Sequence, residues 1–116
     1  MEHYSERQIK VSHEIKNMAA DFFARESSGL SLMTITRCEI SSDLKYAKIF
    51  ISVLPESKEE AALHFAKRMR PELREYSKKK LRMKNLPFFE VEIDYGEKNR
   101  QNIDSLLREE NKEESK

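Results

Sequence analysis

The chain has 116 residues, of which 37% are charged and 38% are apolar, and its formal net charge at pH 7 is +1. This length favours a single domain with a modest core. Its one cysteine, Cys38, excludes an intramolecular disulfide and a cysteine-based metal cluster. No apolar run approaches the ~20 residues that cross a bilayer, and the N-terminus lacks the apolar core of a signal peptide. We therefore expect a soluble, cytoplasmic protein.

The first predicted helix begins at a capping box. In "SERQ", Ser5 is the expected N-cap and Gln8 stands at the third helical position. Behind it, apolar residues at helical spacing draw one stripe: Val11, Ile15, Met18 and Phe22. Gly29 in "SSG" suits a left-handed C-cap and is expected to end this helix.

Two strands are predicted next, over 32–40 and 46–54, since both stretches are rich in β-branched residues and the turn-like "SSDL" separates them. Asp43 is expected to order this turn through its own backbone. Regular alternation along the strand would place Ile35 and Ile40 on opposite faces of the sheet. A β-bulge near Arg37 is therefore needed to bury both side chains. The second strand alternates, with one face to be buried: Ala47, Ile49, Ile51 and Val53. We expect an antiparallel pair.

A proline then interrupts a helical pattern. The pattern begins at a second expected capping box, "SKEE" over 57–60, and its apolar stripe passes straight through Pro71. Proline inside a helix lacks a donor and clashes with the carbonyl four residues back, at a cost of ~3 kcal/mol, but it suits the start of a new helix. We predict two helices that meet at Arg70–Pro71, with the second running to about Leu81.

The remaining elements complete an α+β order. "PFFEVEID" alternates and predicts a third strand that buries Phe89, Val91 and Ile93. A weak helix is expected over 100–110. The predicted order is therefore α-β-β-α-α-β, as one domain over 1–95 with a charged C-terminal tail over 96–116.

Basic residues are concentrated around the predicted helix break. The stretch 67–84 holds nine Lys or Arg and two acidic residues. A helical projection gathers four of the bases on one side: Lys67, Arg74, Lys78 and Arg82. Such a local field attracts phosphate more than the net charge suggests, although a charge run is most often an ordinary solvated face. We predict RNA contacts at Lys67, Arg70, Arg74, Lys78, Lys79, Lys80, Arg82 and Lys84. Candidates for secondary contacts are Arg7, Lys10, Lys45 and Lys48.

The element order, the helix break and the basic flank resemble a type II KH domain, a fold that binds single-stranded RNA. The usual Gly-x-x-Gly loop of KH domains is absent, because the two glycines of the chain, Gly29 and Gly96, lie elsewhere. Three separated blocks resemble ribosome-binding factor A more specifically. The matching residues are Arg7, Lys10, Val11, Ile15 and Met18, then Ser41, Asp43, Leu44, Ala47, Lys48 and Ile49, and finally Leu81, Arg82, Lys84, Pro87 and Asp94. Arg74 matches the interhelical arginine of that family.

This resemblance implies a KH-like, non-enzymatic factor without a cofactor. It implies binding to the free, immature small ribosomal subunit through rRNA, assistance to late rRNA processing and subunit maturation, particularly in the cold, and release before translation. In place of the Gly-x-x-Gly loop, the family carries an Ala-x-Gly kink, which maps onto Met69, Arg70 and Pro71. The chain departs there, since Met69 replaces Ala and Pro71 replaces Gly, which removes any contact to a bare glycine backbone.

Several alternatives stay open at this stage. Tyr46, Phe50 and Phe88 fall on the polar faces of their strands, where aromatics can stack with bases. We favour their being covered by another layer or by the terminal helix. Cys38 is expected to be a small core residue, and the histidines have no spacing that suggests a metal site. The main rival function is a protein-interaction module that docks an acidic partner; an enzyme is disfavoured because no catalytic arrangement is recognisable. We expect a monomer.

Overall fold

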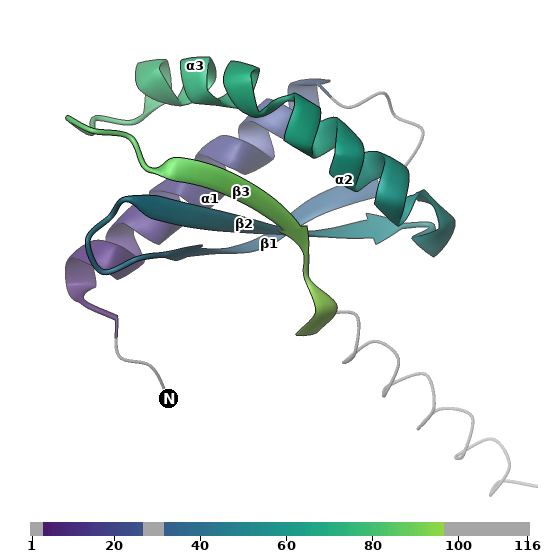
Figure 1. The fold of residues 1–116 in the computed structure, drawn as a ribbon, viewed down its shortest axis with the longest axis horizontal. Coiled ribbons are helices and arrows are strands. Elements are labelled where there is room, and N and C mark those ends of the chain that lie inside the picture. The colour runs from purple at the N-terminus through teal and green to yellow at the C-terminus, as the bar shows by residue number, and fades with distance from the viewer. Residues whose placement is uncertain (1–3, 27–31, 97–116) are drawn as a thin grey trace, which may run out of the picture.

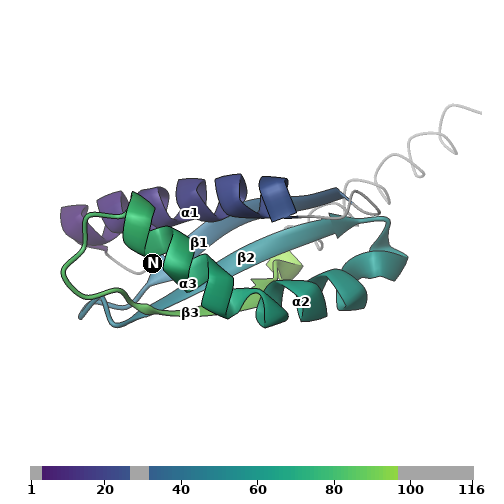
Figure 2. The ribbon, with the colours of Figure 1, turned by 90° about the horizontal axis from the view of Figure 1, so that it is seen from above.

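The structure, a computed structural model, describes residues 4–26 and 32–96. Figures 1 and 2 show three helices stacked on one side of a three-stranded sheet. The elements are α1 (Glu6–Glu26), β1 (Leu32–Ile40), β2 (Tyr46–Leu54), the short 3-10 turn η1 (Glu56–Lys58), α2 (Glu59–Arg68), α3 (Arg70–Lys80) and β3 (Phe88–Ile93). The predicted α-β-β-α-α-β order is confirmed. The expected C-cap at Gly29, the helix over 100–110 and the charged tail lie outside the described residues.

The capping box at the start of α1 is confirmed. The backbone N–H of Gln8 donates to Ser5 Oγ at 3.1 Å, and the Gln8 side-chain carbonyl accepts from the Ser5 N–H at 2.9 Å. The Gln8 amide also donates to the backbone carbonyl of Ile40 at 3.2 Å, which ties the start of α1 to the end of β1. One side chain thus caps the helix and fixes its register on the sheet.

The antiparallel pairing of β1 and β2 and the predicted bulge are both confirmed. Ile35 pairs with Ile51, whereas Arg37 pairs with Phe50, so Thr36 is the extra residue. The bulge lets Ile35 and Ile40 face the core, although they stand at opposite parities in the sequence. It also places Arg37 on the other face of the sheet.

The third strand joins the sheet in parallel with β2, giving the order β1-β2-β3. Its burial alternates as predicted, with Phe89, Val91 and Ile93 in the core. A parallel pair requires a crossover connection, and α2 with α3 supplies it on the same side of the sheet as α1 (Figure 2). No described helix covers the other side, which we call the open face of the sheet.

The expected capping box over 57–60 is wrong. Ser57 lies inside η1, and α2 begins two residues later at Glu59 without a side-chain hydrogen bond at its N-cap position, Lys58. The proline that ends β2 is followed at once by a 3-10 turn, which delays the first turn of α2.

The break between α2 and α3 lies at Met69, which has φ −84° and ψ 1°. Pro71 occupies the first turn of α3, where a missing N–H costs nothing in intrahelical bonding. The carbonyl of Lys67, which would have accepted that N–H, instead accepts from Arg70 Nε at 3.2 Å. The chain therefore resumes a helix after the break, and the N–H of Leu73 donates to the Met69 carbonyl at 2.8 Å.

Helix α3 ends earlier than the helical projection of the basic residues assumed. It stops at Lys80, and Leu81 is extended with φ −100° and ψ 134°. Arg82 and Lys84 consequently lie on the loop that leads to β3, and the interpretation that Arg82 shares a helix face with Lys67, Arg74 and Lys78 is wrong.

Candidate nucleic-acid interface

A groove of about 1170 Å³ lies at one end of the domain, where three chain segments meet. They are the first turns of α1, the turn between β1 and β2, and the end of α3 with the loop that leads to β3. Its apolar floor includes Val11, Leu44, Leu81 and Leu86. The basic side chains around it come from all three segments: Arg7, Lys10, Lys45, Lys80, Arg82 and Lys84. We call this the basic groove.

The β1–β2 turn forms one wall of the basic groove and is held by its own side chains. Asp43 Oδ1 accepts the hydroxyl of Ser41 at 2.6 Å and the backbone N–H of Lys45 at 3.0 Å. These hydrogen bonds lower the pKa of the Asp43 carboxyl, because they favour its charged form. The prediction that Asp43 orders the turn is therefore confirmed.

Leu44, the next residue, adopts a left-handed conformation with φ 61°, which few non-glycine residues accept. Its N–H donates to the Ser41 carbonyl at 2.9 Å, and its side chain packs against the core. Leu44 thus closes the turn while forming part of the groove floor.

The α3–β3 loop forms the opposite wall and is fastened at several points. Arg74 Nη1 donates to the carbonyl of the buried Pro87 at 3.0 Å. The N–H of Phe88 donates to the carbonyl of Lys45 at 2.8 Å, so this loop and the β1–β2 turn are bonded to each other. Leu81 is buried at the helix end. The loop that carries Arg82 and Lys84 is consequently held at both of its ends.

Most of the positive charge around the basic groove is uncompensated. Six basic and two acidic side chains line it, and one of the acids, Asp43, is engaged in the turn. None of the six cations forms an ion pair with another described residue. Lys45 is attracted by the Asp43 carboxylate, and the ammonium of Lys80 lies 5.6 Å from the ring centroid of Tyr76. Cations without an ion pair are nevertheless available to an anionic ligand, and several cations around one concavity reinforce each other's field.

The structure separates the predicted RNA-contact residues into two groups. Lys80, Arg82 and Lys84 line the basic groove together with Arg7, Lys10 and Lys45, the residues expected to make secondary contacts. The other predicted residues lie outside it: Lys67, Arg70, Arg74, Lys78, Lys79 and Lys48.

Most of this second group already has partners inside the protein. Lys78 pairs with Glu75 at 3.0 Å, and Lys48 pairs with Glu92 at 3.5 Å. Arg74 holds the loop at Pro87, and Arg70 bonds the Lys67 carbonyl. Lys67 and Lys79 are exposed on α2 and α3. The convergence of distant segments at the groove, which no spacing in the sequence reveals, is the feature that sequence reasoning missed.

The open face of the sheet carries a polar network that was also not foreseen. The buried carboxylate of Asp94 accepts from Thr36 Oγ1 at 2.6 Å and from Arg37 Nε at 3.2 Å. The Arg37 guanidinium also pairs with Glu39 and lies 3.9 Å from the ring centroid of Phe50. Strand alternation could have placed Asp94 on this face, but the bulge at Thr36 that brings its partners within reach depends on the pairing of β1 with β2.

The expectation that another layer covers these three aromatic rings is wrong among the described residues, and the expected cover by the terminal helix lies outside them. Phe50 is buried beneath Arg37, whereas Tyr46 and Phe88 are 62% and 50% exposed. Both stand at the end of the open face, where no described layer packs.

Cys38 packs against the core from β1, as expected. Burial raises the pKa of its thiol to about 12, so the thiolate is scarce at neutral pH and the side chain is unreactive there. Among the described residues, no three His, Cys, Asp or Glu side chains gather as metal ligands. No described helix is long and apolar enough to cross a membrane.

Comparison with known proteins identifies what the chain is similar to. Residues 7–107 match the family model of ribosome-binding factor A. Ribosome-binding factor A of Brevibacillus brevis is 32% identical over 107 residues, which cover 86% of this chain and 85% of the relative.

Two structural comparisons agree on the fold. The crystal structure of ribosome-binding factor A from Thermus thermophilus superposes with a TM-score of 0.68 at 21% identity, covering 74% of this chain and 93% of that one. A homology model of the Thermus thermophilus protein, fitted into a cryo-EM map of its complex with 30S, gives a TM-score of 0.58 at 21% identity, with 78% and 93% coverage.

Proposed function

The chain belongs to the ribosome-binding factor A family, and from this premise we propose that it binds the small ribosomal subunit through rRNA. The basic groove is the proposed contact. The finer parts of the proposal are that the factor acts by binding rather than catalysis, assists late rRNA processing and subunit maturation in the cytoplasm, particularly in the cold, and works as a monomer. The resemblance of the three sequence blocks supports these finer parts, and the similarity to a chain fitted into a 30S complex supports the choice of subunit.

The convergence of six unpaired cations from three segments carries the proposal. Phosphate contacts position a protein on nucleic acid without reading bases, and folded RNA is recognised largely by shape. A groove with fastened walls and cationic rims provides both requirements. The ion pairs of Lys48 and Lys78, by contrast, reduce the attraction of those two lysines for phosphate.

The test is co-sedimentation with purified small subunits across a salt series. If four to six phosphates are engaged, log K should fall against log salt with a slope of roughly −3 to −5. The groove variant combines Lys10→Glu, Lys45→Glu and Arg82→Glu. Three lost contacts of ~1 kcal/mol each predict an affinity about a hundredfold lower, with a shallower slope.

The matched control reverses the same number of charges outside the groove, through Lys67→Glu, Arg68→Glu and Lys79→Glu. We expect this flank variant to bind within a few-fold of wild type. If the flank variant loses binding and the groove variant keeps it, the contact lies on the helix pair and the groove assignment is wrong.

An acidic protein partner is the second candidate, since the same unpaired cations would attract carboxylates. Binding to naked rRNA from the subunit separates the two functions. Groove-dependent binding to naked rRNA supports the proposal, whereas a chain that binds subunits but not their rRNA would be a protein-interaction module.

A further inference from the structure

Two large aromatic side chains stand in solvent side by side on the open face of the sheet. Tyr46 on β2 is the register partner of Phe88 on β3. Their ring centroids are 6.5 Å apart with an interplanar angle of 67°, and the rings are 62% and 50% exposed. The pair therefore presents apolar ring surface to water at the start of both strands.

Neither ring contributes to the core, although this sheet can bury an aromatic side chain on the same face. On the same face, Phe50 is buried beneath the guanidinium of Arg37, which shows how this sheet covers an aromatic ring. Tyr46 and Phe88 have no comparable cover among the described residues. Exposed aromatic neighbours on a strand pair are the arrangement on which nucleobases stack.

The rings lie on a continuous path from the basic groove. Lys45, which lines the groove, immediately precedes Tyr46, and its carbonyl accepts the N–H of Phe88 at 2.8 Å. At Phe88, the guanidinium of Arg70 lies 5.9 Å from the ring centroid. An RNA strand whose phosphates follow the groove thus meets a cation beside each of the two rings.

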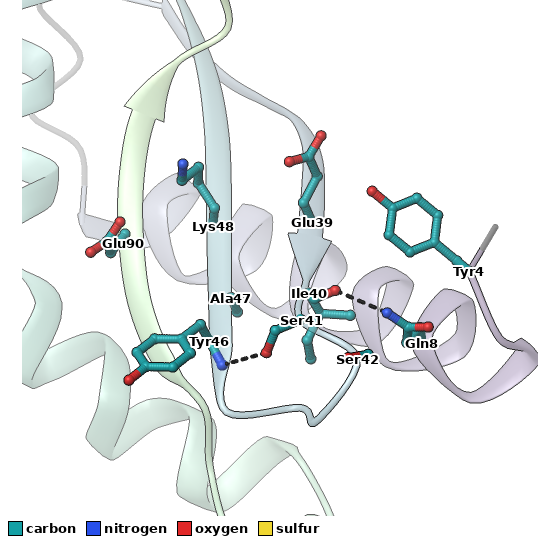
Figure 3. Close-up of a pocket in the computed structure, with 10 residues that line it drawn as sticks. All are labelled: Tyr4, Gln8, Glu39, Ile40, Ser41, Ser42, Tyr46, Ala47, Lys48 and Glu90. Atoms are coloured by element: carbon teal, nitrogen blue, oxygen red, sulfur yellow. Dashed lines mark hydrogen bonds between the residues drawn. The ribbon is translucent and has the colours of Figure 1, made fainter. Parts of the chain in front are cut away.

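A second hollow, about 680 Å³ in volume, adjoins Tyr46 on the open face. Figure 3 shows that it is lined by strand side chains, among them Lys48 on β2 and Glu90 on β3, and by Tyr4 and Gln8 at the start of α1. Ser42 borders both this hollow and the basic groove. Glu90 forms no ion pair within 4.0 Å of another described residue, so its carboxylate is available as a hydrogen-bond acceptor.

We propose that Tyr46 and Phe88 form a stacking site for an unpaired base of the bound RNA, with Glu90 facing the edge of that base. This inference rests on the proposed function, since the groove must first hold the RNA backbone. A carboxylate accepts from exocyclic amino groups and repels phosphate. The backbone therefore stays on the side of Lys45 and Arg70, and the site favours a base that carries an amino group over uracil.

The experiment measures binding of fluorescent single-stranded oligocytidine, oligouridine and an RNA duplex. Stacking of one base predicts that Tyr46→Ala with Phe88→Ala weakens oligocytidine binding about tenfold to a hundredfold. Duplex binding should stay within twofold of wild type, because paired bases are not available for stacking. Tyr46→Phe with Phe88→Tyr retains both rings and should restore oligocytidine binding, and urea unfolding confirms that each variant is folded.

Glu90→Gln separately tests whether the carboxylate recognises the edge of the base. We expect oligocytidine to bind more tightly than oligouridine to wild type, and this preference to fall severalfold in Glu90→Gln while oligouridine binding rises or stays unchanged.

Two results would overturn the inference while leaving the proposed function intact. In the first, the alanine pair leaves oligocytidine binding unchanged and the groove variant abolishes it. In the second, the alanine pair affects only the binding of an oligoarginine peptide, which would make the open face a docking site for a basic protein. Failure of every RNA to bind would overturn the proposed function and this inference together.

Discussion

The basic groove and the open face of the sheet both carry Lys and Arg, but they use them differently. On the open face, Arg37 binds Asp94 and Glu39, and Lys48 binds Glu92. Around the groove, six cations have no ion-pair partner among the described residues. The same residue types therefore stabilise the fold in one region and remain available to a ligand in the other. Counting charges along a sequence does not distinguish the two uses.

The difference follows from the backbone. Paired strands hold side chains of the same face close together, so that diagonal cross-strand neighbours such as Lys48 and Glu92 come within reach. The groove is built from a helix start, a turn and a loop, where successive side chains diverge. Cations on such segments have few acidic neighbours, and their positive potentials add in the concave surface between them.

The largest expected effect comes from removing the support of the groove wall. Leu73 is fully buried and is the one large apolar side chain that α3 (Arg70–Lys80) buries completely. Leu73→Ala should lower the free energy of unfolding by about 2–5 kcal/mol, as measured by urea denaturation. Glu72→Ala, at an exposed neighbouring position, is the matched control. A loss below ~1 kcal/mol would mean that α3 is held mainly by its polar contacts.

An intermediate loss of stability is expected when Arg37, a cation that is paired within the protein, is replaced. Arg37→Ala leaves the buried Asp94 carboxylate with fewer donors and uncovers Phe50, which should lower the free energy of unfolding by about 1–3 kcal/mol. Arg37→Lys keeps the charge but not the planar stacking, and should recover part of the loss. Subunit binding should change in neither variant. A binding defect with unchanged stability would contradict the distinction between paired and available charges.

The smallest effect concerns acid stability of the groove wall. The pKa of Asp43 is lowered in the folded state, chiefly by the Ser41 hydroxyl and then by the Lys45 N–H. The resulting stabilisation is present above the unfolded-state pKa of ~3.9 and is lost as the pH falls through the lower folded-state value. Asp43→Asn retains an oxygen acceptor without the charge.

We therefore expect the melting temperature of Asp43→Asn to fall less than that of wild type between about pH 5 and pH 2. Asp43→Ala serves as the control, because it removes the turn hydrogen bonds and should already melt earlier at pH 7. If the melting temperatures of wild type and Asp43→Asn fall by the same amount across this pH range, protonation of the carboxylate is not coupled to folding.

The parts of this fold that the sequence predicts are those governed by local rules. The capping box at Ser5 and Gln8 and the alternation of Phe89, Val91 and Ile93 depend on neighbours within a few positions. Even the bulge near Arg37 could be inferred, because burying both Ile35 and Ile40 requires it. The capping box at Ser57 failed since η1 after Pro55 displaced the helix start.

The candidate site was only half predictable, because it is made of contacts between segments. Local charge density in the sequence was enough to predict Lys80, Arg82 and Lys84. Their proximity to the other three cations of the groove depends on the packing of α1 and α3 against one sheet. Arg74 and Lys78 had the same sequence signature and proved to be engaged within the protein. The exposure of Tyr46 and Phe88 likewise depends on which face of the sheet the helices leave bare.

The parallel pairing of β2 with β3 also orders events during synthesis of the chain. Elements α1, β1 and β2 are consecutive and can associate as soon as residue 54 has emerged, whereas β3 can pair only after the whole crossover has been made. Arg7 and Lys10 belong to the early part, and Arg82 and Lys84 to the late part. A nascent chain therefore exposes an incomplete groove, and its full electrostatic field arises only when the last strand closes the sheet.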